Sequence, residues 1–118
     1  MAELGKGDTV GEVALGGAWS CRRLVEERGA AIHFLKVLAQ DSRVKIVCHL
    51  MARERSVGEL AALASLHQST VSQHLARLRS EGLVSSRRDG NAILYSIADE
   101  RVRSVLFAVW DVKGADAA

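Results

Sequence analysis

Short neutral side chains open the segment HQSTVSQHLARLRSEG, residues 67–82. Hydroxyl and amide groups fill its first turns, at Gln68, Ser69, Thr70, Ser72 and Gln73. Its cations, Arg77 and Arg79, come later. A helix that only faces water usually carries Glu and Lys, whereas short amides and hydroxyls match the hydrogen-bonding edges of base pairs. The segment therefore predicts a face that reads DNA, with simple first-turn capping by Gln68 and Ser69 as the alternative.

The cysteines, Cys21 and Cys48, are the other side chains with distinctive chemistry. Cys21 lies beside Arg22 and Arg23 at the expected start of a helix, and both features favour the thiolate. Cys48 falls on an apolar helix stripe, where a thiol is more often an inert part of the core. Two cysteines cannot build a disulfide framework, and a cytosolic protein keeps them reduced at rest.

Several classes of protein are not indicated by the sequence. It has no CxxC or HExxH motif, no Gly-rich phosphate loop after a strand and no spacing that suggests a Ser/His/Asp triad, so we expect no enzyme and no cofactor. No apolar run approaches the ~18 residues of a membrane helix. The N-terminus lacks the continuous apolar core of a signal peptide, so we expect a cytoplasmic protein.

The length of 118 residues suits one domain with a modest aliphatic core. Residues 1–17 hold five of the ten glycines, which predicts a flexible arm. A folded domain is expected over residues 18–113, followed by a frayed tail over 114–118. Helices are expected over residues 19–40, 43–53, 57–64, 68–81 and 100–113, and β-strands over 83–88 and 91–97.

The second expected helix is capped by Asp41 or Ser42 and carries one apolar stripe. This stripe consists of Val44, Val47, Cys48 and Met51. The next helix begins with the capping-box pattern SVGE, residues 56–59, and a turn at 65–67 leads into the helix that opens with Gln68. Short helix, tight turn and longer helix form a helix-turn-helix, whose second helix enters the major groove of DNA.

A β-hairpin follows directly, because Asp89-Gly90 is a strong signal for a two-residue turn. The predicted fold is therefore mainly α with a β-hairpin wing, a winged helix-turn-helix. Residues 64–91 hold four Arg against two acids, so the positive charge gathers here, although a solvated basic face is the alternative. Asp99 is expected to cap the last helix, in which Phe107 and Trp110 broaden an apolar face that one small domain does not cover.

The segment STVSQHLARLRSEGLVSSRRDGNAILYSI resembles the ArsR/SmtB family of dimeric winged-helix repressors, and LAQDSRVKIVCHL is similar to the second helix of that family. The resemblance spans roughly residues 30–110 and its motif is distinctive. It implies a homodimer formed through the first and last helices. It also implies binding to an inverted repeat, with the two recognition helices about 34–36 Å apart, and release by an inducer.

By this resemblance the base-reading residues are Gln68, Ser69, Ser72 and Gln73, with Thr70 beside them. Arg87 and Arg88 become wing contacts, for which a solvated strand end is the alternative, and Arg43 a phosphate contact. The chain departs from the family at His67, where Ser or Asn usually caps the recognition helix. Either Ser65 and Gln68 form a substitute capping box, or His67 approaches a phosphate.

The family resemblance also bears on which inducer this chain could bind. The family's metal ligands are thiols in the third helix or Asp and His pairs in the last helix, and this chain has neither, so we expect no metal site. Cys48 matches the second-helix cysteine of the sulfide- and redox-responsive subgroup, but the usual partner in the last helix is missing and Cys21 is its only replacement. Release by oxidation or persulfide chemistry at these cysteines is the hypothesis. A non-thiol inducer, no inducer, or a winged-helix protein-interaction module are the alternatives.

Overall fold

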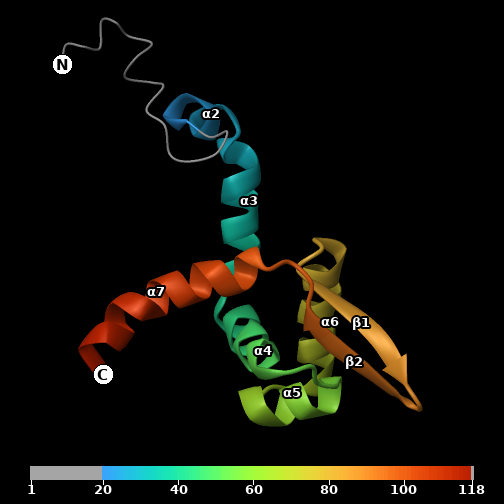
Figure 1. Cartoon of the computed structure of the whole chain (residues 1–118). Coiled ribbons are helices and arrows are strands. Elements are labelled where there is room, and N and C mark those ends of the chain that lie inside the picture. The colour runs from blue at the N-terminus through green and yellow to red at the C-terminus, as the bar shows by residue number, and fades with distance from the viewer. Residues whose placement is uncertain (1–19, 118) are drawn as a thin grey trace, which may run out of the picture. The chain divides into compact units, whose positions relative to one another are not determined.

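The structure, a computed structural model, describes residues 20–117, with side chains placed for residues 20–110 (Figure 1). The predicted arm, residues 1–17, lies outside the described residues. The chain divides into two compact units, residues 1–37 and residues 38–118, which are described separately. The single folded domain expected over residues 18–113 stays a prediction.

The first unit contains α2 (Cys21–Glu26) and most of α3 (Arg28–Leu38). Ser20 caps α2, since its Oγ accepts a hydrogen bond from the backbone N–H of Arg23 at 3.3 Å. The predicted start is therefore confirmed, but the single helix expected up to residue 40 is wrong. The chain turns at Glu27, and Gly29, a poor helix former, follows directly.

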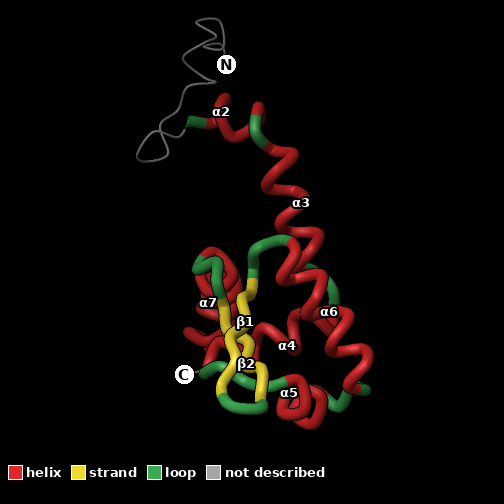
Figure 2. Tube along the Cα trace, turned by 90° about the vertical axis from the view of Figure 1, so that its right-hand side faces the viewer, coloured by secondary structure: helices red, strands yellow, loops and turns green. Residues whose placement is uncertain are grey.

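The second unit contains α4 (Asp41–Ala52), α5 (Val57–Ala64), α6 (Gln68–Ser80), β1 (Val84–Asp89), β2 (Ala92–Ile97) and α7 (Arg101–Ala117). Within it α4 packs against α5, α6 and β2, and α6 packs against β1 (Figure 2). Up to residue 110, the largest fully buried side chains of this unit are aliphatic: Ile46, Val47, Leu50, Leu60, Val71, Leu75, Leu78, Val84 and Val102. The predicted fold class, mainly α with a hairpin wing, is confirmed.

Two details of α4 differ from the prediction. Its cap is Gln40, whose Oε1 accepts from the backbone N–H of Arg43 at 2.9 Å, in place of Asp41 or Ser42. The buried stripe is Ile46, Val47 and Leu50, because this side of the helix faces the rest of the core. Cys48 is half-buried and does not belong to that stripe, so its predicted place in the core is wrong.

The hairpin turn lies one residue further along than predicted. Asp89 still pairs with Ala92, so the turn residues are Gly90 and Asn91. Only Gly90 has a positive φ, at 65°, which is the requirement of a type II′ turn with glycine in its first central position. A third, one-residue strand was not predicted: Arg55 and Tyr95 exchange both backbone hydrogen bonds, at 3.0 and 2.8 Å.

The last helix, α7, continues to Ala117, past the expected end at Lys113. Val102 and Leu106 are buried, whereas Phe107, Val109 and Trp110 are 55%, 59% and 42% exposed. The predicted uncovered apolar face is therefore present within this unit. Among the described helices, none is both long and apolar enough to cross a membrane.

Candidate nucleic-acid interface

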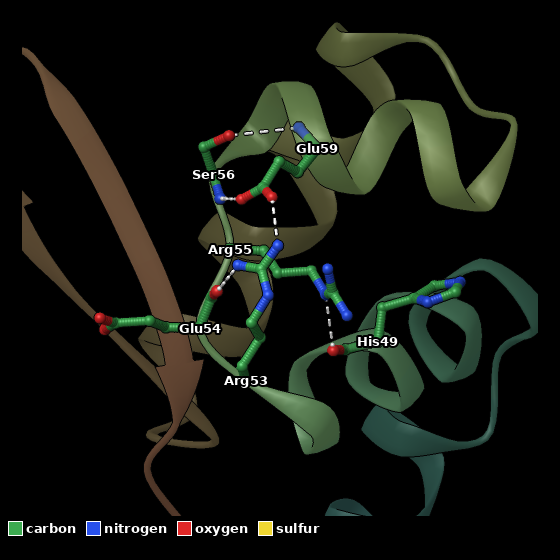
Figure 3. Close-up of polar contacts among 6 residues, drawn as sticks. All are labelled: His49, Arg53, Glu54, Arg55, Ser56 and Glu59. Atoms are coloured by element: carbon green, nitrogen blue, oxygen red, sulfur yellow. Dashed lines mark hydrogen bonds and ion pairs between the residues drawn. The ribbon is translucent and has the colours of Figure 1, made fainter.

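The helix-turn-helix is built by local hydrogen bonds. Ser56 Oγ accepts from the backbone N–H of Glu59 at 3.2 Å, and Glu59 Oε1 accepts from the backbone N–H of Ser56 at 3.1 Å (Figure 3). This capping box starts α5 at the predicted residue. Ser65 ends α5 in the left-handed region, with φ of 57°, and the chain turns into α6. The predicted helix, turn and helix over residues 57–80 are thus confirmed.

The second helix, α6, has a buried seam and an exposed polar face. Val71, Leu75 and Leu78 are completely buried and hold the helix on the core. Gln68, Ser69, Ser72 and Gln73 are exposed, while Thr70 is half-buried. The first turn contains no acidic residue, so nothing in it repels an anion. The predicted reading face is therefore open and uncharged.

The start of α6 lacks the usual cap. His67 occupies the N-cap position, and no side-chain hydrogen bond caps the helix there. Ser65 serves as the C-cap of α5, so the substitute box with Gln68 is not formed. The Gln68 amide nitrogen lies over the start of α5, 3.8 Å from where a Cβ on Gly58 would be. Among the predicted readers, Gln68 therefore leans toward the preceding helix.

Arg43, the predicted phosphate contact, is half-buried between α4 and α6. Its Nη1 lies 3.5 Å from Nδ1 of His74. Because a guanidinium only donates, this contact requires an unprotonated Nδ1 on His74. Burial, and secondly the charge of Arg43, lower the pKa of His74, which favours the neutral ring. Arg43 is thus directed at α6 in this structure.

The wing arginines lie on opposite faces of the hairpin. Arg87 pairs with Glu54, donating from Nε to Oε2 at 3.0 Å and from Nη2 to Oε1. These hydrogen bonds hold the pKa of Glu54 below its usual value. Arg88 instead donates from Nη1 to the carbonyl of Gly90 at the turn, at 3.5 Å. The sequence predicted equal roles for these neighbours, and it did not single out Glu54.

The two cysteines lie in separate units. Cys21 is the first residue of α2 and is partly exposed. Cys48 is half-buried in α4, and burial raises the pKa of its thiol. Within the part of the chain that the structure describes, no group of three or more His, Cys, Asp or Glu residues is placed to hold a metal ion.

Residues 40–86 match the family described as "Bacterial regulatory protein, arsR family". The chain is 34% identical to the transcriptional activator HlyU of Vibrio cholerae over 91 residues, which span 77% of this chain and 84% of HlyU. It is 41% identical to the nodulation protein NolR of Rhizobium meliloti over 91 residues, spanning 77% of this chain and 75% of NolR.

Solved structures of similar proteins share the fold. Reduced HlyU from Vibrio cholerae superposes with a TM-score of 0.71 at 33% identity, covering 77% of this chain and 96% of its own. The transcriptional repressor BigR from Xylella fastidiosa gives 0.70 at 33% identity, covering 77% and 94%. The homodimeric winged helix-turn-helix DNA-binding domain of Mb0332 from Mycobacterium bovis gives 0.62 at 32% identity, covering 86% and 93%.

The family match, the named relatives and the fold indicate the same class of protein. The matched residues contain the helix-turn-helix and the beginning of the first wing strand. The named relatives are transcriptional regulators and not enzymes. The fold is that of the winged helix-turn-helix neighbours. The chain therefore belongs to the ArsR family of bacterial regulatory proteins, as a DNA-binding transcriptional regulator.

Proposed function

We propose that the protein is a homodimeric repressor that binds an inverted-repeat operator and is released by oxidation or persulfide chemistry at cysteine. The observation that carries the DNA-binding part is the front of α6, which is exposed, uncharged and held by a fully buried seam. BigR, a structural relative, is named a repressor. HlyU is named an activator, so the sign of regulation is part of the proposal.

The proposed base readers are Ser69, Ser72 and Gln73, with Gln68 and Thr70 at the edge of the surface. Gln73 supplies an amide that can donate and accept together, which suits the edge of adenine, and the serines suit several bases. Gln68 reads DNA only if its amide turns away from α5. Arg88 is the proposed wing contact, and Arg43 contacts a phosphate only after leaving His74.

A second copy of the chain is the proposed cover for the exposed apolar side chains. Phe107, Val109 and Trp110 are exposed on α7. Leu24 and Leu35, on α2 and α3, are 45% and 48% exposed. Large apolar side chains in such numbers mark interaction surfaces, and the Mb0332 neighbour is homodimeric. These helices are also the ones that the family resemblance assigns to the dimer.

The proposed switch is a bond between Cys21 and Cys48, direct or through polysulfide sulfur. For the direct bond, both thiols lose their protons and two electrons pass to an oxidant such as a low-molecular-weight disulfide. The raised pKa of Cys48 leaves little thiolate there, so we propose that Cys21 reacts first and Cys48 resolves the product. The bond can form within one chain or across the dimer.

DNA binding is tested by selecting bound duplexes from a random pool and measuring affinity against salt. We expect selected duplexes to contain inverted repeats and the affinity to fall steeply as salt rises, because phosphate contacts release counterions. Failure to bind any duplex at low salt overturns the proposal. That result favours the other candidate, a winged-helix module that binds protein through the same exposed face.

The switch is tested on the reduced protein after treatment with a disulfide oxidant or with polysulfide. Intact mass without reductant reports bond formation, and affinity for a selected duplex is measured in parallel. We expect release from DNA in the parent and no release in Cys21→Ser or Cys48→Ser. Equal responses in all three proteins overturn the thiol switch, in favour of a non-thiol inducer, without affecting the DNA-binding proposal.

A further inference from the structure

The loop between α4 and α5, residues 53–56, is joined to the wing in two ways. Arg55 forms the backbone bridge with Tyr95 of β2, and Glu54, the preceding residue, pairs with Arg87 of β1. Figure 3 shows Glu54 directed away from the loop toward the hairpin strands. The same loop is fastened to the helices, since Arg55 Nε donates to the carbonyl of His49 at 2.9 Å. The wing is therefore tied to the base of the helix-turn-helix.

The register explains why this pair crosses the sheet. Arg87 lies opposite Leu94 on β2, and Arg55 lies opposite Tyr95. Because side chains alternate between faces along a strand, Glu54 and Arg87 share one face and reach toward each other across the middle strand. Arg88 lies on the other face, near the turn. The Glu54–Arg87 pair thus spans all three strands, in the half of the hairpin nearer its turn.

The hydrogen-bonding groups of Arg87 and Glu54 also match in geometry. The guanidinium of Arg87 meets both carboxylate oxygens of Glu54 through two donors, an arrangement that fixes direction as well as distance. A phosphate that took Arg87 would have to break both hydrogen bonds and leave the Glu54 carboxylate beside the negative DNA backbone. Arg87 is therefore poorly placed as a phosphate contact while the pair is intact.

We propose that Glu54 and Arg87 form a strap that sets the angle of the wing, and that Arg87 is a positioning residue and not a DNA contact. This inference rests on the proposed DNA binding. The wing's direct contact with DNA then comes from the turn, through Arg88. The strap requires an ion pair between residues 54 and 87, and either residue can carry the cation. A phosphate contact requires the cation at residue 87.

The test is an exchange of the two charges. Arg87→Glu and Glu54→Arg break the pair singly, and the double variant restores it with the parent's net charge. The probe is a duplex selected from a random pool by the parent protein. We expect Arg87→Glu to weaken binding about tenfold or more, equivalent to ~1.4 kcal/mol, and the double variant to recover most of that loss. A double variant as weak as Arg87→Glu overturns the strap and makes Arg87 a contact.

Salt dependence gives a second readout, which separates the loss of a phosphate contact from the loss of a positioning residue. Arg88→Ala should lower the slope of log affinity against log salt by about one for each bound subunit, because one phosphate contact is lost. Arg87→Ala should lower the affinity at an unchanged slope. An equal fall in slope for both variants overturns the strap.

A matched control for the loss of one exposed ion pair is available at the start of α7. Arg101 pairs with both carboxylate oxygens of Asp99, and this ion pair does not involve the wing. Arg101→Ala removes the pair but keeps the carboxylate that accepts from the backbone N–H of residue 101, so the affinity should be unchanged, unlike in Arg87→Ala. A parent protein that binds no selected duplex overturns the proposed function as well as the strap, whereas a binding parent with an unrescued double variant overturns the strap alone.

Discussion

Helices α6 and α7 both leave one face uncovered, and the two faces have opposite chemistry. The exposed front of α6 carries amides and hydroxyls on a helix whose seam is completely buried. The exposed part of α7 carries Phe107, Val109 and Trp110, and up to residue 110 this helix buries only Val102 and Leu106. Exposure alone is therefore no guide to function, and the type of side chain must be read with it.

The difference indicates different partners. A polar face without acidic residues loses little when water is replaced by base edges and phosphates, which offer equivalent hydrogen bonds. An aromatic and aliphatic face gains only when another apolar surface removes it from water. The front of α6 thus suits DNA, and α7 suits a second copy of the chain.

Trp110→Glu should disrupt α7's proposed role. A carboxylate in a newly buried interface must lose its hydration, so the dimer should dissociate. A monomer binds one half-site and loses the gain from linked binding, so affinity for a selected inverted repeat should fall about 100-fold or more. Sedimentation velocity measures the dimer, and duplex titration measures the affinity.

Ser104→Glu is the control, since it adds the same charge at an exposed polar position of the same helix. It should leave both the assembly and the affinity close to those of the parent. If Trp110→Glu stays dimeric and binds normally, the apolar face of α7 is not the dimer interface, and the partner proposed for α7 is wrong.

Gln73→Ala should disrupt the proposed role of α6. Losing a paired amide costs about 1–3 kcal/mol against the preferred base, so affinity for the selected duplex should fall roughly tenfold. Alanine favours the helix, so unfolding is no explanation for the loss. Random-sequence duplex should bind as before, because phosphate contacts are unchanged. Arg88→Ala is the comparison, and it should lose affinity equally for the selected and the random-sequence duplex. An equal loss in Gln73→Ala would show that Gln73 does not read bases.

Patterns within one element were predictable from the sequence. The capping box of Ser56 and Glu59 requires only two residues three positions apart, and the buried seam of α6 follows from helical spacing. The open front of α6 followed with it, because residues opposite a buried seam face outward. The hairpin was also predicted, although its turn moved by one residue because Gly90 takes the first central position.

Features between distant elements were not predictable. Arg87 and Glu54 are 33 positions apart, and the local sequence around either residue does not predict that they form a pair. The same holds for the bridge of Arg55 with Tyr95, which depends on how the hairpin meets the α4–α5 loop. Cys48 was placed on the wrong side of α4, because periodicity finds an apolar stripe but does not choose between overlapping ones.

His67→Ser should strengthen the start of α6. His67 makes no side-chain cap, whereas Ser at an N-cap accepts a hydrogen bond from the helix and stabilises it by about 1 kcal/mol. The urea midpoint should therefore rise with an unchanged slope. His67→Ala is the matched control and should show no gain, because alanine cannot cap. A weaker affinity of His67→Ser for DNA despite higher stability would support a phosphate contact by His67.

The smallest expected effect is a pH dependence of stability at His74, on the inner edge of α6. Burial and the charge of Arg43 lower its pKa below the ordinary histidine value of 6.5, so the folded protein takes up this proton less readily than the unfolded chain. This contribution to the free energy of unfolding is present above that value and is lost as pH falls toward the folded pKa.

The urea midpoint should therefore fall between about pH 7 and about pH 5.5, where an ordinary histidine gains its proton. His74→Gln keeps an acceptor for Arg43 but cannot titrate, so its midpoint should fall less over this range. His67→Gln is the control at the exposed start of the same helix, where no such contact with Arg43 exists. If the midpoint of His74→Gln falls as much as that of the parent, the pH dependence does not come from His74 and its contact with Arg43.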